Sequence, residues 1–421
     1  MTKLFYLTIA AVAGFILYWS VSQGGVHDIS VTPNENLRFW QIQSIDTMKF
    51  SRDLAKERIN DSRFDQVIAK QVSDIAQTKA THIAIGTPYD EEFTPFMRKW
   101  VIEARKNNLN VWFRGNLSGW EGWFGYPRID RAAHVVGVEN FILNNPDLFE
   151  DGDIFSACPE CENGGPGDPR LTKDIEGYRT FLIEEYNVLK NSFKKIGKQV
   201  ASNYYSMNGD IVDAVMDPQT ARALDGIVVV DHYVLSPEIL AADVERYAIQ
   251  TGGKIVLGEF GAPIPDIHGK FTEEQQRDWI KNSLNLLSRS KVLIGINYWT
   301  NADSSTQLWR SDGTQNEAGK ILSEFYDSKM VHGFVRDELD RPIADARVAT
   351  EYSETTTNRF GYFELPVAGL TKLSVVSDLY HQEEIVVERL DQSVNFKLVL
   401  KHEGPIFRAV KLIRNLGQNS E

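Results

Sequence analysis

From about residue 37 to residue 329, short apolar segments alternate with longer amphipathic segments. This alternation is typical of βα units that build a parallel sheet. The apolar segments predict eight strands, at Leu37–Ser44, His82–Gly86, Asn110–Arg114, Ile154–Ala157, Gln199–Asn203, Gly226–Val230, Lys254–Gly258 and Leu293–Tyr298. The amphipathic segments predict helices, among them Phe64–Thr78, Pro95–Asn107, Asp174–Ile196, Pro237–Gln250, Glu273–Ser288 and Ala318–Lys329. We therefore predict an α/β fold, a (β/α)8 TIM barrel, for residues 35–329. An open doubly wound sheet is the rival, but no glycine-rich phosphate loop follows the first strand.

The pattern changes at about residue 330, where short strands begin to follow one another without helices between them. This predicts a small all-β sandwich domain over residues 330–400. The segment resembles the carboxypeptidase regulatory-like module through Gly333-Phe-Val335, Asp340-Arg-Pro342, Ala346-Arg-Val348, Thr357 and Gly361-Tyr-Phe363. The resemblance implies an accessory domain rather than a catalytic one. Residues 401–421 predict an amphipathic helix or a frayed tail.

The N-terminal segment differs from the rest of the chain. After Lys3, the run from Leu4 to Val21 is almost uncharged and about long enough to cross a bilayer as a helix. Residues 1–24 are therefore interpreted as a cleaved signal peptide or an uncleaved signal anchor, a membrane-spanning segment. The length of the run and the lack of a clear Ala-x-Ala site favour the anchor. Either interpretation places the rest of the chain outside the cytoplasm.

Composition and charge narrow the function classes. The chain has 42% hydrophobic and 24% charged residues, as in ordinary globular proteins, and a net charge of -13. The negative charge argues against nucleic acid as a partner, because proteins that bind it usually present a basic surface. Cys158 and Cys161, the only cysteines, are too few for a structural zinc site but sufficient for one short disulfide. We expect no metal and no cofactor.

Two strands of the predicted barrel end in carboxylates. Glu259 directly follows the seventh strand, and Glu160 and Glu162 follow the fourth. The chemistry of such barrels takes place at the C-terminal ends of the strands. Hydrolysis of a glycosidic bond needs two carboxyl groups there, one that attacks or stabilises the anomeric carbon and one that protonates the leaving oxygen.

The barrel resembles the clan A glycoside hydrolases, which carry an acid/base after strand 4 and a nucleophile after strand 7. The resemblance implies a retaining glycosidase with Glu259 as nucleophile and Glu160 as acid/base. In that clan the acid usually stands in an Asn-Glu-Pro motif, whereas this chain has Pro159-Glu160-Cys161. The missing asparagine leaves Glu162 as an alternative acid/base, although Glu160 lies closer to the strand end.

Aromatic and polar residues after several strands are candidates for binding the substrate. After strand 6, Tyr233 resembles the aromatic that orients the clan's nucleophile, and after strand 8, Trp299 resembles its tryptophan at the floor of the -1 subsite. The predicted substrate-binding residues are Arg114, Asn116, Trp120, Trp123, Tyr205, Tyr233 and Trp299. Trp120 and Trp123 are equally compatible with a loop core, and Arg114 with a structural role.

Three functions remain open from the sequence. The first is a retaining glycosidase that acts outside the cytoplasm on a carbohydrate substrate. The second is a catalytically inactive barrel that binds carbohydrate at the cell surface, which the missing asparagine and the Cys-x-x-Cys around Glu160 motivate. The third is a metal-dependent hydrolase, for which only Asp231 and His232 stand as ligands at a strand end. The sugar, the linkage and the oligomeric state are not specified by the sequence.

Overall fold

The computed structural model describes residues 38–369, 371–387 and 393–402, together with residues 404, 405, 407, 408 and 411. By its contacts the chain divides into Met1–Glu35 and Asn36–Glu421, and all described residues belong to the second unit. The predicted signal peptide or anchor at residues 1–24 lies outside the described residues, as does most of the predicted tail. Among the described helices, none combines the length and the apolar character that crossing a membrane requires.

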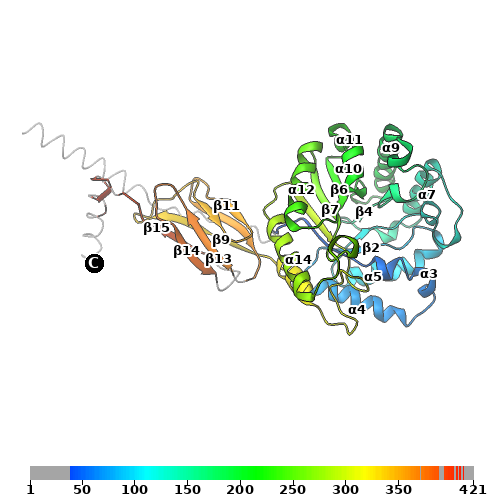
Figure 1. Cartoon of the computed structure of the whole chain (residues 1–421), viewed down its shortest axis with the longest axis horizontal. Coiled ribbons are helices and arrows are strands. Elements are labelled where there is room, and N and C mark those ends of the chain that lie inside the picture. The colour runs from blue at the N-terminus through cyan, green and yellow to red at the C-terminus, as the bar shows by residue number, and fades with distance from the viewer. Residues whose placement is uncertain are drawn as a thin grey trace, which may run out of the picture. The chain divides into compact units, whose positions relative to one another are not determined.

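Eight parallel strands form one curled sheet that is TIM-barrel-like (Figure 1). Their order is β4-β3-β2-β1-β8-β7-β6-β5. The strands are β1 (Ile42–Asp46), β2 (His82–Ile85), β3 (Asn110–Phe113), β4 (Ile154–Phe155), β5 (Ser206–Asn208), β6 (Ile227–Asp231), β7 (Lys254–Phe260) and β8 (Leu293–Tyr298). A parallel bridge between Ile154 and Ala201 joins β4 to the segment that precedes β5. The α/β prediction and its parallel sheet are therefore confirmed.

Helices cover the outer face of this sheet. The longer ones are α4 (Phe64–Gln77), α5 (Thr94–Lys106), α7 (Arg131–Asn144), α9 (Ile175–Lys195), α10 (Gly209–Val215), α12 (Pro237–Thr251), α14 (Glu273–Leu287) and α15 (Glu317–Tyr326). Shorter ones are α2 (Met48–Ser51), α3 (Ala55–Arg58), α6 (Ser118–Glu121), α8 (Pro169–Thr172), α11 (Pro218–Ala223) and α13 (Pro265–His268). Single 3-10 turns lie at Glu91–Phe93, Trp123–Gly125, Pro146–Leu148 and Cys161–Asn163. Capping residues mark the beginning of several of these helices. In the capping box of α14, the Thr272 side chain accepts from the Gln275 backbone N–H, and the Gln275 side chain accepts from the Thr272 backbone N–H.

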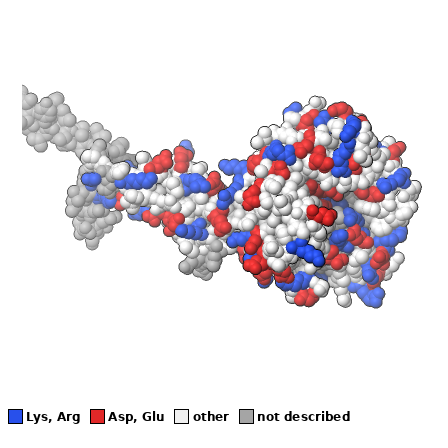
Figure 2. Space-filling model, in the orientation of Figure 1, with Lys and Arg blue, Asp and Glu red and all other residues white. Residues whose placement is uncertain are grey.

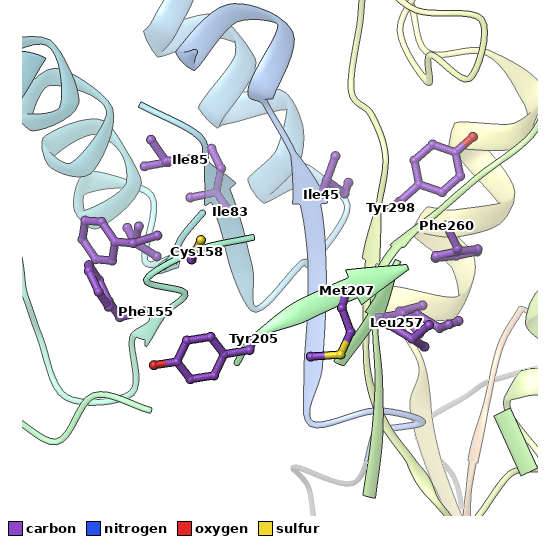
Figure 3. Close-up of a cluster of buried hydrophobic side chains, with 14 of the residues drawn as sticks. Ile45, Ile83, Ile85, Phe155, Cys158, Tyr205, Met207, Leu257, Phe260 and Tyr298 are labelled. Atoms are coloured by element: carbon purple, nitrogen blue, oxygen red, sulfur yellow. The ribbon is translucent and has the colours of Figure 1, made fainter. Parts of the chain in front are cut away.

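The two faces of each strand have different partners, because successive side chains of a strand point to opposite faces. Side chains on the outer face, such as Ile45, Ile83 and Leu257, belong to the large core between sheet and helices (Figure 3). Side chains on the inner face form a smaller apolar cluster, with members Ile42, Ala84, Trp112, Ile154, Tyr204, Val229 and Val256. Closer to the C-terminal ends of the strands, the charged side chains of Asp46, Arg114, Asp231 and Glu259 take the place of these apolar ones. The alternation thus places charged side chains inside the sheet above an apolar floor.

Several predicted boundaries are wrong. The first strand was expected at Leu37–Ser44, but β1 is Ile42–Asp46. The fifth strand was expected at Gln199–Asn203, but only Ala201 of that segment bridges to a neighbour, and β5 itself is Ser206–Asn208. Its register with β6, Ser206 opposite Val229, defines the strand although its sequence is barely apolar. The last helix ends at Tyr326 rather than Lys329, because Lys329 already pairs with Val367 in the following sheet.

Beyond α15 the chain forms two small sheets. The strands are β9 (Lys329–Asp337), β10 (Arg347–Ala349), β11 (Glu354–Thr356), β12 (Tyr362–Val367), β13 (Thr371–Val376), β14 (Glu383–Val387) and β15 (Phe396–Leu398). One sheet has the order β11-β10-β13-β14 and the other β12-β9-β15. All neighbouring strands are antiparallel except β9 and β15. Apolar side chains of both sheets share one buried core, which confirms the predicted all-β character. The assignment to the carboxypeptidase regulatory-like module stays a prediction.

Candidate active site

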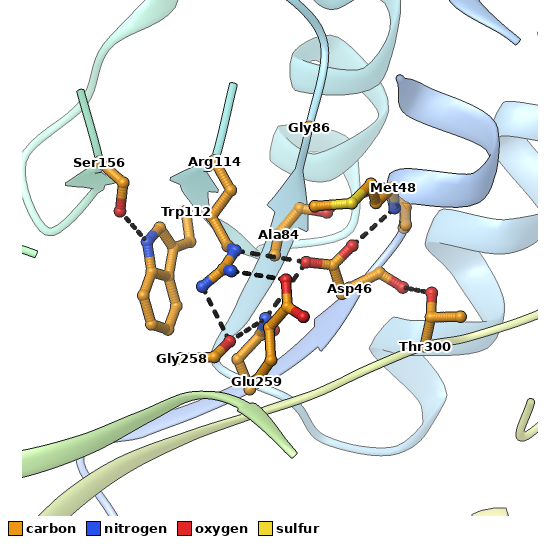
Figure 4. A network of polar contacts seen from close by, with 12 residues as sticks. Asp46, Met48, Ala84, Gly86, Trp112, Arg114, Ser156, Gly258, Glu259 and Thr300 are labelled. Atoms are coloured by element: carbon orange, nitrogen blue, oxygen red, sulfur yellow. Dashed lines mark hydrogen bonds and ion pairs between the residues drawn. The ribbon is translucent and has the colours of Figure 1, made fainter. Parts of the chain in front are cut away.

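Charged side chains from four strand ends meet inside the curled sheet. Figure 4 shows three of them, Asp46, Arg114 and Glu259. Arg114, directly after β3, lies at their centre. Its Nη2 atom donates to Glu259 Oε1 at 2.7 Å and lies 3.2 Å from Asp231 Oδ2, while its Nε atom lies 3.4 Å from Asp46 Oδ2. Its Nη1 atom donates to the Gly258 carbonyl at 2.8 Å. One buried guanidinium therefore serves three carboxyl groups, from β1, β6 and β7.

The protonation of this cluster follows from burial. Burial raises the pKa of Asp46 to about 6, against the opposing charge of Arg114. Burial also raises the pKa of Asp231 well above its ordinary value, again opposed by Arg114. Three buried anions beside one cation would be costly, and the raised pKa values of the two aspartic acids lower that cost by favouring their protonated forms. Of the three carboxyl groups, Glu259 makes the shortest ion pair with Arg114.

Glu259 is held at both carboxylate oxygens. Arg114 binds Oε1, and the hydroxyl of Tyr233 donates to Oε2 at 2.7 Å. The ring of Trp299 stands edge-on to that of Tyr233, with centroids 6.1 Å apart. The ammonium group of Lys49, from α2, lies over the ring of Trp299, 5.6 Å from the ring centroid. Three of the predicted substrate-binding residues are thus gathered around the predicted nucleophile.

The backbone next to Glu259 depends on a glycine. The pairing of β6 and β7 shifts by one residue there, so that Asp231 lies opposite Glu259 and Gly258 is the extra residue of a bulge. A Cβ at Gly258 would lie 2.3 Å from Asp231 Oδ1 and 2.8 Å from Val229 Cγ1. Only glycine therefore lets Asp231 and Glu259 approach Arg114 together.

Glu160 lies on the loop after β4, in the left-handed backbone region with a φ of 47°. Its N–H donates to the carbonyl of Ser206 at 2.8 Å, and a disulfide between Cys158 and Cys161 brackets it. Burial and, second to it, the nearby charge of Glu259 raise the pKa of Glu160 to about 8. A carboxyl group with that pKa is protonated at neutral pH and can act as a general acid.

The same loop carries Glu162, but its side chain points elsewhere. Glu162 accepts hydrogen bonds from the backbone N–H of Asn208 at 2.7 Å and from the Asn208 side chain at 3.1 Å. Tyr178 also donates to it at 3.4 Å, and the residue is only 2% exposed. These bonds occupy Glu162 in the junction between the loop and β5. The geometry therefore favours Glu160 as the acid.

A small cleft opens at Glu160 and Glu259. Its lining comprises Met48, Arg52, Arg114, Asn116, Glu121, Trp123, Pro159, Glu160, Asn163 and Glu259. Arg52 and Glu121 were not among the predicted site residues. Arg52 forms an ion pair with Asp53. Its guanidinium also covers the ring of Trp123, with Cζ 5.1 Å from the ring centroid. Glu121 could have been predicted as a cleft residue, because it lies two residues before Trp123 in the sequence.

Asn116 supports the cleft from behind. It is buried, and its Nδ2 atom donates to Glu121 Oε1 at 2.6 Å. Its Oδ1 atom faces His134 Nε2 at 2.8 Å, and His134 Nδ1 lies 2.6 Å from Glu185. The backbone N–H of Leu117 also donates to Oδ1, which fixes the orientation of the amide. His134 thus holds Asn116, and Asn116 holds Glu121 at the cleft.

Two predicted substrate-binding residues are placed in the core instead. Trp120 is 1% exposed, stacks on Phe181 at 5.3 Å between ring centroids, and donates its indole N–H to the Cys161 carbonyl. Tyr205 is 3% exposed and belongs to the apolar cluster around Phe155 (Figure 3). Neither ring is accessible to a substrate. Both lie on segments without clear periodicity, so their orientation could not be deduced from the sequence.

Among the described residues, neither the charge on the face shown in Figure 2 nor the grouping of possible metal ligands indicates a nucleic-acid or metal site. On the face shown in Figure 2, basic and acidic side chains are interspersed rather than gathered into a basic surface. Within the described part of the chain, no three His, Cys, Asp or Glu side chains are grouped so that they could hold a metal ion.

Replacing Arg114 with methionine should destabilise the protein strongly. The substitution leaves Asp46, Asp231 and Glu259 buried without their cation, and breaking a buried ion pair from one side typically costs about 3–5 kcal/mol. The free energy of unfolding from urea denaturation at pH 7 measures this. The matched control is Arg277→Met on the exposed surface of α14, which should change the value by no more than about 0.5 kcal/mol. Equal effects of the two substitutions would contradict the central role of Arg114.

Known structures resemble this fold, whereas no protein-family model and no curated protein matches the sequence. Two GH5_18 glycoside hydrolases crystallised with Manβ1-4GlcNAc, from Bifidobacterium longum subsp. longum and Streptomyces cattleya, each reach a TM-score of 0.50 at 12% identity. They cover 72% and 65% of this chain, and 84% and 80% of their own chains. β-Glucuronidase 2 from Bacteroides uniformis has a TM-score of 0.44 at 10% identity, over 79% of this chain and 44% of its own. This chain spans about half the length of the β-glucuronidases it resembles. The chain therefore shares the TIM-barrel-like fold of the GH5_18 glycoside hydrolases.

Proposed function

We propose that the protein is a retaining glycoside hydrolase in which Glu259 is the nucleophile and Glu160 the acid/base. One observation carries the proposal. Two carboxyl groups line a single cleft at the ends of β4 and β7, and their surroundings differ. Glu160 has a pKa raised to about 8, whereas Glu259 is bound by the cation of Arg114 and the hydroxyl of Tyr233. A general acid must hold a proton at the working pH, whereas a nucleophile must be an ionised carboxylate, and these different surroundings suit the two roles.

In the first step, Glu259 Oε attacks the anomeric carbon while the bond from that carbon to the leaving oxygen breaks. Glu160 gives its proton to the leaving oxygen, so that the aglycone departs as an alcohol. In the second step, the now ionised Glu160 takes a proton from water, and the water oxygen displaces Glu259 from the anomeric carbon. Glu160 ends protonated and Glu259 ionised, as at the start. Two inversions leave the anomeric configuration retained.

Arg114 and Tyr233 keep the nucleophile ready without neutralising it. Both donate to Glu259, and because both come from rigid strand ends, the carboxylate needs little reorganisation before it attacks. Trp299 and Trp123 offer half-buried aromatic surface on either side, on which the apolar faces of a sugar ring can pack. We infer a neutral or weakly charged saccharide as substrate, because acidic and basic side chains alternate around the cleft.

Three further features of the protein are proposed: closure of the barrel, an accessory domain and a location outside the cytoplasm. The bridge between Ile154 and Ala201 supports closure of the sheet into a complete (β/α)8 barrel. The motif residues of the all-β region support a carboxypeptidase regulatory-like accessory domain. A location outside the cytoplasm is supported by the apolar run at Leu4 to Val21 and by the Cys158–Cys161 disulfide, since disulfides persist in oxidising compartments.

A carbohydrate-binding barrel without activity is the second candidate. The observation in its favour is the lack of the asparagine that precedes the acid in clan A enzymes, where this chain has Pro159. The two candidates differ in the fate of a bound saccharide. A binding protein leaves it intact through long incubation, whereas an enzyme cleaves it.

The test of the proposal is hydrolysis by the full-length chain across an array of aryl glycosides and neutral polysaccharides at pH 6. For any substrate that is cleaved, proton NMR within the first minutes identifies the anomer of the released sugar. We expect the anomer of the substrate to appear first, before mutarotation. Release of the opposite anomer would contradict the double displacement, and binding without any cleavage would favour the inactive barrel.

A further inference from the structure

A second, larger cavity lies beside the cleft, with a volume of about 590 Å³. It is bounded on one side by α4 and on the other by the long loop between β8 and α15 (Figure 1 labels α4). Residues Gln66, Lys70 and Gln71 contribute from α4, and Gln307 and Trp309 from the loop. Ligand sites in proteins typically have about 300–1,000 Å³, so this cavity is large enough for more than one sugar ring. None of its residues takes part in the carboxylate cluster.

The side chains of this cavity are suited to hydroxyl groups. The amides of Gln66 and Gln307 and the Nε2 group of Gln71 have no hydrogen-bond partner within the described part of the chain, whereas Gln71 Oε1 accepts from Asn301 at 2.8 Å. An amide offers both a donor and an acceptor, which matches the paired donor and acceptor character of sugar hydroxyls. The ring of Phe50, half-buried, adds apolar surface.

The described residues of the cavity carry no surplus positive charge. Its three cations each pair with a carboxylate: Arg63 with Asp61, Lys70 with Asp74, and Arg310 with Glu273. Asp303 adds a further carboxylate to the lining. A site for a phosphate or another strong anion would leave cationic groups unpaired and directed inward. The paired charges and the free amides together favour a neutral, polyhydroxylated ligand.

The cavity and the cleft are neighbours along two segments of the chain. On α2, Met48 lines the cleft and Phe50, two residues later, lines the cavity. After β8, Trp299 contacts Tyr233 beside Glu259, and Ala302 three residues later lines the cavity. A saccharide that extends from the cleft past Lys49 and Trp299 therefore reaches the cavity.

We propose that this cavity binds the extension of a neutral oligosaccharide whose reacting end occupies the cleft, so that the protein acts on chains of several sugars. The inference rests on the proposed function for the assignment of the cleft, but not for binding at the cavity itself. The glutamine amides bind hydroxyl groups of the distal sugars, and the half-buried ring of Phe50 packs against their apolar faces.

The test compares saccharide length with the cavity intact and altered. The background is the full-length Glu259→Gln variant, which should bind without turnover. The probes are gluco-, manno-, xylo- and galacto-oligosaccharides, each as a disaccharide and as a hexasaccharide, and binding is measured by isothermal titration calorimetry. We expect one series in which the hexasaccharide binds at least tenfold more tightly than the disaccharide.

Gln66→Ala and Gln307→Ala, singly and combined, should remove most of that difference and leave the disaccharide affinity unchanged. The matched control is Gln219→Ala, an exposed glutamine on α11, which should preserve it. A hexasaccharide that binds no more tightly than its disaccharide in any series, or a difference that survives both cavity substitutions, would overturn the proposal.

The outcomes separate this inference from the proposed function. Length-dependent binding that the cavity substitutions abolish supports the cavity even if the unaltered chain hydrolyses nothing. Conversely, hydrolysis of short substrates with no effect of length or of the cavity substitutions supports the glycosidase and rejects the extension site.

Discussion

Replacing Glu259 with glutamine should lower kcat by about 10⁴–10⁶-fold, a range expected when the attacking group of a covalent mechanism is removed. A glutamine has the same shape but lacks the negative charge that forms the bond to the anomeric carbon. Its carbonyl can still accept from Arg114 or Tyr233, so the cleft should keep its structure. Asp46 and Asp231 remain beside Arg114 as partners for its charge, so the variant should stay folded.

The measurement is the initial rate on the best aryl glycoside, together with the melting temperature of each variant. The matched control is Glu162→Gln, the same substitution at a buried glutamate that faces Asn208 rather than the cleft. It should retain activity within about tenfold. A Glu259→Gln enzyme as active as the unaltered chain would exclude Glu259 as nucleophile, and an inactive Glu162→Gln variant would reopen the choice of acid.

The second large effect concerns Glu160. Replacement with glutamine removes the transferable proton, and general acid catalysis typically contributes about 10²–10⁴-fold. The loss should therefore depend on the leaving group. Substrates with a sugar or alkyl leaving group should lose about 10³-fold in kcat/KM. A dinitrophenyl glycoside, whose leaving group departs without a proton, should lose far less in its first step.

The pH profile gives an independent measure of the same group. Glu160 acts as an acid only while protonated, and its pKa is raised to about 8. On the alkaline side, activity should therefore fall about tenfold per pH unit above that value. The Glu160→Gln variant should lack this alkaline limb. A limb that persists in the variant would assign it to another group, such as a tyrosine or Asp231.

The same raised pKa has a consequence for stability. In the unfolded chain Glu160 loses its proton near its ordinary pKa of 4.5, whereas the folded protein keeps the proton up to about pH 8. Its contribution to stability is thus fully present below pH 4.5 and is lost as the pH rises through 8. Relative to the unaltered chain, the Glu160→Gln variant should become more stable across that window.

Much of the fold follows from periodicity alone. Strands such as β2, β3 and β8 begin at the residues that the apolar segments predicted, because each is buried and bounded by polar turns. β5 was misplaced, because Ser206 and Asn208 carry no apolar signal and become a strand only through pairing with β6. Non-local pairing of this kind leaves no trace in the local sequence.

The sequence predicted those site residues that lie at or just after the C-terminal ends of strands. Glu259 lies near the end of β7, and Glu160 and Tyr233 lie on the segments after β4 and β6, so the topology brings them to one rim. The roles of Trp120 and Glu121 depended on the packing of a loop, which put the first into the core beside Phe181 and the second at the cleft. Asp46 was overlooked, because its predicted strand ended two residues early, at Ser44.

The central cluster draws its members from residues 46, 114, 231 and 259, which span most of the curled sheet. Asp46 and Arg114 lie on one side of the pairing between β1 and β8, and Asp231 and Glu259 lie on the other side. All four side chains are therefore brought together only when β1 and β8 pair. Because burial in the assembled sheet raises the pKa values of Asp46 and Asp231, closure of the sheet is linked to pH and should be favoured where these two groups bind protons.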